Sequence, residues 1–133
     1  MEDIYASQNT VIASLHREAD VIQAYIQQPL TLEDPAALTV RLSHMDVYMA
    51  RLSDIMIRAK TMKEREKNSY IAQNEAELNK LTATISNRKI DAYLQEHTAL
   101  YNRLDAMYHT MEHLTRDLVT QISYIKQQMQ THC

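Results

Sequence analysis

Apolar residues recur along the last third of the chain at steps that alternate between four and three positions. The pattern runs from Ile90 to Met129, and within it only His97 and Thr115 are not plainly apolar. This spacing keeps side chains on one side of an α-helix, whereas a strand, with its period of two, would scatter them over both faces. A second apolar row widens the stripe beyond a two-stranded coiled-coil seam: Tyr93, Leu100, Met107 and Leu114. We therefore expect a long helix that packs against more than one neighbour.

Two earlier stretches show the same periodicity. The first predicted helix covers residues 3–28 and ends there because Pro29 disfavours helical geometry in the residue before it. The second begins where Asp34 can cap the first turn and Pro35 can occupy the first helical position, in which its missing N–H is no loss. The chain is thus expected to start with two amphipathic helices joined by a short connection.

The end of the second helix is marked less directly than its start. Its apolar stripe lapses over residues 60–69 and resumes at Ile71 with a shifted phase. Because good helix formers fill the lapse, we expect an unbroken helix over residues 35–84 whose apolar face rotates. A break near residues 66–70 is the alternative.

Turn-forming residues place the next connection at residues 86–89, which leaves residues 89–130 for the last helix. Arg88 and Lys89 suit the negative end of the preceding helix better than the positive end of the next one. A short extra helix near residues 86–97, with Thr98 capping the last helix, is the competing division.

The chain contains no glycine among its 133 residues. Glycine supplies the positive φ and the close backbone approach that phosphate-binding loops need, so nucleotide binding through a glycine-rich loop is excluded. No composition break indicates a second domain. We expect residues 1–133 to form one all-α domain, an elongated antiparallel and coiled-coil-like bundle of three main helices.

The three predicted helices differ in length. At about 1.5 Å per residue the second and third reach roughly 70 and 60 Å, whereas the first spans less than about 40 Å. The first helix is therefore expected to cover residues 38–59 and 115–129 and to leave the other half of the hairpin bare. We expect a second copy to cover that half, which makes the protein at least a dimer. The candidate oligomer-core residues are Ile71, Leu78, Leu81, Ile85, Leu94, His97 and Tyr101.

The net charge of −3 is unevenly distributed. Residues 58–103 carry nine Lys or Arg against six Asp or Glu, whereas residues 1–57 carry three against eight. Such a basic region can contact an acidic partner, although mixed signs at one-residue spacing more often form a solvated helix face. The candidate partner-binding residues are Arg58, Lys60, Lys63, Arg65, Lys67, Arg88 and Lys89.

Residues 109–113 spell H-x-x-E-H, in which two histidines one helical turn apart can bind zinc beside a general base. That site needs a third ligand downstream, and both histidines lie off the apolar stripe. Exposed helical histidines are the favoured interpretation of His109 and His113, and we predict no catalytic residue, metal or cofactor. His97 lies in the stripe and is interpreted as a hydrogen-bonded core residue or as one that fixes helix register.

The first residues, Met1, Glu2 and Asp3, are acidic where a signal peptide would be basic, and no apolar run approaches the roughly 20 residues of a membrane span. Cys133 is the single cysteine, so no intramolecular disulfide can form, and we give it no role. These features predict a cytoplasmic protein without a membrane partner.

Two stretches resemble a group of small helical proteins encoded in phage and mobile-element gene clusters. The resemblance lies in Ala50 and Arg51 followed by Ala59 and Lys60, and in His113 followed by Ile122, Ser123, Lys126 and Met129. It spans about half the chain. The group has no assigned activity, so the resemblance implies a viral or mobile-element setting, with the host cytoplasm as compartment, and no site.

Together these features predict a non-enzymatic accessory or inhibitor protein that binds a macromolecular partner, such as a host or defence protein. The first alternative is a nucleic-acid-associated accessory of replication or recombination. A structural coiled-coil spacer, which would bind only itself, and a metal-dependent hydrolase are the others.

Overall fold

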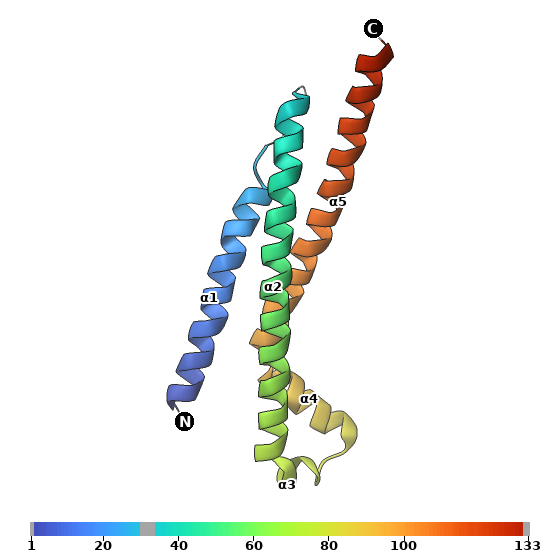
Figure 1. Ribbon diagram of the computed structural model, residues 1–133. Helices are drawn as coiled ribbons and strands as arrows, with labels where there is room; N and C mark the ends of the chain where they lie inside the picture. Colours follow the sequence, from blue (N-terminus) through green and yellow to red (C-terminus); the bar gives the residue numbers. More distant parts are fainter. Residues whose placement is uncertain (1, 30–33, 132–133) are drawn as a thin grey trace.

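The computed structural model describes residues 2–29 and 34–131, which form five helices and no strand. The helices are α1 (Glu2–Ile26), α2 (Pro35–Gln73), α3 (Glu75–Leu78), α4 (Ala83–Tyr93) and α5 (Gln95–Thr131). Figure 1 shows the three long helices side by side, with α2 running opposite to α1 and α5, and with α3 and α4 folded back beside the end of α2. The all-α prediction is confirmed. Within the described ranges, no helix has the length and apolar character needed to cross a membrane.

The start of α2 follows the predicted capping. The Asp34 side chain accepts a hydrogen bond from the Ala36 amide at 3.0 Å, and Pro35 is the first helical residue. The carboxylate thereby satisfies one of the amides that a helix N-terminus leaves without a partner. The capping of the second helix could therefore be predicted from two adjacent residues.

The main core lies where α1, α2 and α5 meet, and it is built from the predicted apolar stripes. Its largest fully buried side chains are Leu15, Ile22, Leu38, Met45, Leu52, Leu100, Leu104, Met111 and Leu118. The stripes of three helices face one another, so each helix buries an apolar face of the width that the periodicity indicated. Packing of these faces is the main source of stability for helices of this length.

Two arginines contact α1 from the other two long helices. Arg41 of α2 lies 4.1 Å from the centre of the Tyr25 ring and donates to the Tyr25 carbonyl oxygen at 2.7 Å. Arg103 of α5 donates to the Asp20 carboxylate at 2.6 Å and to the His16 carbonyl oxygen at 3.3 Å. The second contact places α1 against the first half of α5, so the prediction that α1 covers residues 115–129 instead was wrong.

The predicted continuation of the second helix to residue 84 was also wrong, as was the alternative break near residues 66–70. The helix ends at Gln73, where Asn74 leaves helical geometry with φ −119° and ψ 20° and its side-chain amide donates to the Tyr70 carbonyl oxygen at 2.9 Å. A side-chain amide that takes a helical carbonyl in this way competes with the next turn of the helix. The single turn α3 follows.

The predicted turn at residues 86–89 lies inside α4. Thr82 has an extended ψ of 155° and its hydroxyl accepts from the Ile85 amide at 3.4 Å, so the helix begins there. The competing division, with an extra helix near residues 86–97, was closer, but that helix ends at Tyr93. Thr98 lies within α5, which begins at Gln95, and caps nothing.

The folded-back segment covers the end of the α2–α5 hairpin within a single chain. Leu78, Ile90 and Leu94 are buried there as a second cluster. The partly buried side chains packed around them are Tyr70, Ile71, Leu81 and Tyr93. We call this group the tip cluster. The predicted bare half of the hairpin is therefore covered by α1, α3 and α4, which removes the reason given for a dimer, and self-association stays a prediction.

If the tip cluster forms within one chain, removing its most deeply buried side chain must lower the stability of the folded protein. Leu94 is 2% exposed, and we expect Leu94→Ala to lower the free energy of unfolding by about 2 to 5 kcal/mol through lost burial and the resulting cavity. Ile85, 45% exposed on α4, is the matched control, and Ile85→Ala should cost less than about 1 kcal/mol. Urea denaturation measures both, and equal small losses would contradict the described tip.

Candidate functional site

The predicted basic region is divided by the structure between two sides of α2. Lys60, Lys63 and Lys67 line a hollow beside α5, whereas Arg58 and Arg65 line a groove beside α1. The helical period explains the division, because residues at i, i+3 and i+7 share one face, and a pair seven residues apart can share another. The sequence predicted one surface, and the fold makes two surfaces with different chemistry.

The groove between α1 and α2 has an apolar floor. It has a volume of about 520 Å³, and Val11 and Leu15 of α1 meet Ile57 and Met62 of α2 along it. Ile57 is 66% exposed, more than Val40 at 54% and Val47 at 58%, the other exposed large aliphatic side chains described on α2. We call it the arginine groove, after its two flanking cations.

The two guanidinium groups of this groove have different surroundings. Arg58 forms an ion pair with Glu18 of α1 at 3.3 Å, with both side chains about half exposed to solvent. Such an exposed pair contributes little to stability and exchanges readily. Glu66 also lines the groove, but its carboxylate accepts a hydrogen bond from Tyr93. Glu18 and Glu66 therefore bring two carboxylates to a groove that has two guanidinium groups.

The hollow on the other side of α2 is smaller and more strongly charged. It has a volume of about 260 Å³ and is lined by Lys60, Lys63, Glu64 and Lys67 of α2 and by Tyr101 of α5. Tyr101 was predicted as an oligomer-core residue, and it is half-buried on the α5 side of this hollow. We call this site the lysine hollow.

The other two basic candidates lie elsewhere. Arg88 and Lys89 are exposed residues of α4, and neither lines the arginine groove or the lysine hollow. The basic excess of residues 58–103 is therefore spread over at least three surfaces, and two of these are shaped concavities.

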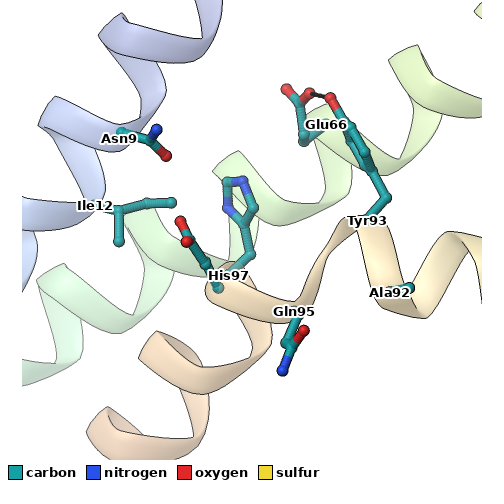
Figure 2. Close-up of a pocket in the computed structure, with 8 residues that line it drawn as sticks. Asn9, Ile12, Glu66, Ala92, Tyr93, Gln95 and His97 are labelled. Atoms are coloured by element: carbon teal, nitrogen blue, oxygen red, sulfur yellow. Dashed lines mark hydrogen bonds between the residues drawn. The ribbon is translucent and has the colours of Figure 1, made fainter.

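A third set of polar residues lies where α4 meets α5. These residues line a depression of about 410 Å³ that is bounded by α1, α2, α4 and α5. Figure 2 shows the Tyr93 hydroxyl directed at the Glu66 carboxylate, to which it donates a hydrogen bond, with the His97 ring between this pair and Ile12 in the view. Tyr93 also stacks on Tyr70, with 4.3 Å between ring centres. We call Glu66, Tyr93 and His97 the elbow cluster.

Sequence reasoning missed Glu66, which is only 8% exposed. It follows the buried Ala59 by seven residues, so the heptad pattern points to it, but its acidic side chain was taken as part of the lapse in the stripe. Tyr93 stabilises the buried carboxylate from a position 27 residues away. No local pattern in the sequence indicates that Glu66 and Tyr93 would pair.

His97 is buried, as its place in the stripe predicted, with 5% of its surface exposed. Burial lowers the pKa of His97, while Glu66 and Glu96 act in the opposite direction and Lys63 adds to the lowering. Its Nδ1 atom is buried and has no hydrogen-bond partner in the described part of the chain, so the predicted hydrogen bond is not seen at that atom. Burial therefore disfavours the charged form of His97.

The histidine pair of the H-x-x-E-H motif lies on the exposed outer side of α5. His109 approaches Asp105 at 3.6 Å and Glu112 at 3.7 Å, which are weak surface contacts. No group of three or more His, Cys, Asp or Glu suited to a metal ion occurs among the residues that the structure describes. Cys133 lies outside the described residues.

The candidate oligomer-core residues are distributed unevenly over the surface. Leu78, Leu94 and His97 are buried within the single chain, Ile71, Leu81 and Tyr101 are half-buried, and Ile85 is exposed. Ile85 is therefore the candidate that a second copy would reach most easily.

Comparison with protein families, curated proteins and solved structures finds no match to this chain. The resemblance to phage-encoded helical proteins stays a prediction. Functional conclusions therefore rest on the residues and contacts described above.

The burial of neutral His97 predicts a pH-dependent stability. Above its ordinary pKa of 6.5 the folded and unfolded chains both hold this histidine neutral, and below that pH the unfolded chain takes up a proton first. The free energy of unfolding should therefore fall as the pH drops below 6.5, by at most about 1.4 kcal/mol per pH unit, the limit for one proton.

Denaturation of the native chain and of His97→Leu between neutral pH and mildly acidic pH isolates this contribution. We expect a shallower loss of stability in His97→Leu, whereas His113→Leu, a change at an exposed histidine, should behave as the native chain does. Parallel pH profiles for the native chain and His97→Leu would show that His97 is not held neutral.

Proposed function

We propose that this protein acts without catalysis, by holding a protein partner in the arginine groove. The observation that carries the proposal is the apolar lining of the groove, in which Ile57, two-thirds exposed, lies together with Arg58 and Arg65. Protein interfaces combine an apolar centre with a polar rim and are enriched in arginine. The arginine groove has this combination on a small scale.

The groove chemistry indicates what the partner presents. An apolar side chain inserted over Ile57 and Val11 would gain about 1.5 to 3 kcal/mol from burial before the costs of association. Carboxylates of the partner beside this side chain would form bidentate hydrogen bonds with Arg58 and Arg65, and Glu18 would be displaced from Arg58. An acidic amphipathic helix meets both requirements, because its apolar and acidic residues recur on adjacent faces.

The proposal takes α1, α2 and α5 as an elongated antiparallel bundle that presents the groove along one side. It agrees with the predicted accessory or inhibitor role, for which the resemblance implies only a viral or mobile-element setting. The absence of glycine-rich loops from the sequence supports a binding role over nucleotide-dependent catalysis.

The second candidate function, association with nucleic acid, is favoured by a separate observation. The sequence has no aromatic residue between the three lysines. Tyr101 of α5, however, lines the same hollow. Lysines with an aromatic ring are the elements of single-strand recognition.

A triple variant tests the proposed function. Ile57→Glu with Arg58→Gln and Arg65→Gln places a charge on the floor and removes both cations, at positions exposed enough to leave the fold intact. In affinity capture from host lysate, quantified by mass spectrometry, we expect the partner to be recovered at least about tenfold less with this variant, since groove centres contribute most binding energy.

The matched control is Val119→Glu, which adds the same charge at an exposed apolar position of α5 outside the groove. It should retain the partner as the native chain does. Circular dichroism checks that both variants are folded. Equal recovery by the native chain and the triple variant would contradict the proposed function.

A further inference from the structure

The lysine hollow gathers like charges at a cost to the isolated chain. Lys60, Lys63 and Lys67 are separated by three and four residues, and like charges at these spacings destabilise a helix. Among the described residues that line the hollow, Glu64 is the one carboxylate. Ion pairs in the described part of the chain join none of the three ammonium groups to a carboxylate. A bound anion would relieve this repulsion.

The spacing of the ammonium groups suits a linear polyanion. From Lys60 to Lys67 the backbone of α2 rises about 10 Å, so the three lysines extend along the helix as a short row that a linear polyanion can follow. Lys63 lies between them in sequence and is half-buried, whereas Lys60 and Lys67 are exposed. The three cations thus form a short row along one helix.

Tyr101 adds a feature that simple anion binding does not need. Tyr101 belongs to α5 and lines the hollow together with the three lysines of α2, which brings an aromatic ring on which a base can stack. A volume of about 260 Å³ accommodates one base and not a base pair. Because bases of a duplex are stacked and paired, a base can reach the recessed ring only from a single strand.

The overall charge limits how such a ligand is held. The chain carries −3 and has a pI of about 6.0, so long-range attraction of a polyanion is absent and binding must come from the local row. We propose that the lysine hollow binds single-stranded nucleic acid, with phosphates on Lys60, Lys63 and Lys67 and one base against Tyr101. The proposal is independent of the arginine groove and of the protein partner proposed for it.

The salt dependence of binding tests the three phosphate contacts. Fluorescence anisotropy of a labelled oligothymidylate, titrated with the full chain at several salt concentrations, should give a plot of log K against log salt with a slope of about −2, since each contact to a single strand contributes about −0.7. Lys60→Gln and Lys67→Gln should each make the slope shallower by about 0.7. Arg58→Gln with Arg65→Gln is the matched control and should leave the slope unchanged.

The ring is tested separately. Tyr101→Leu should weaken binding about tenfold without changing the slope, and Tyr101→Phe should retain most of the affinity, because stacking uses the ring and not the hydroxyl. Circular dichroism confirms that each variant is folded.

Several results would overturn the proposal. The proposal is wrong if no binding is measurable, or if the lysine changes leave the slope of log K against log salt unaffected. It is also wrong if duplex binds as well as the single strand and Tyr101→Leu has no effect. Competition by inorganic pyrophosphate equal to that by the oligonucleotide, at matched phosphate concentration, would contradict it too. Competition by polyglutamate as strong as that by the oligonucleotide would assign the hollow to an acidic protein instead.

Discussion

The packing of α2 against α5 determines what every other part of this protein can do. Their facing stripes bury Leu52, Leu104 and Met111 completely, and α1 completes the core from one side. With α5 on one side of α2 and α1 on another, the polar residues of α2 are sorted between the two flanks. The same helix therefore presents lysines beside a tyrosine on one flank and arginines beside an apolar floor on the other.

Much of this architecture could be predicted from local sequence patterns. Apolar periodicity located the three long helices, and Asp34 with Pro35 marked the start of α2, because these signals involve residues a few positions apart. The end of α2 was missed because Asn74 acts through its own backbone geometry and side-chain hydrogen bond, to which apolar periodicity is blind. The turn of the chain at Thr82 was also missed, because helix-forming residues continue through it without a break.

The sites were predictable in composition but not in arrangement. The basic candidates were identified from charge alone and were taken as one surface, whereas the helical period divides Arg58 and Arg65 from the three lysines. Which flank faced α1 and which faced α5 depended on contacts between distant parts of the chain, such as that of Arg103 with Asp20. The Glu66–Tyr93 pair depended on the same long-range packing, so no local pattern could reveal it.

A single chain covers the end of its own α2–α5 hairpin through α3 and α4 (Figure 1). Native-state hydrogen exchange, followed over about a hundredfold range of protein concentration, tests it most directly. The account predicts slow exchange of the amides of α4 and of Leu94, with protection that does not change with concentration. Rapid exchange in dilute solution, with protection appearing only at high concentration, would contradict it and would assign the covering of the hairpin to a second copy.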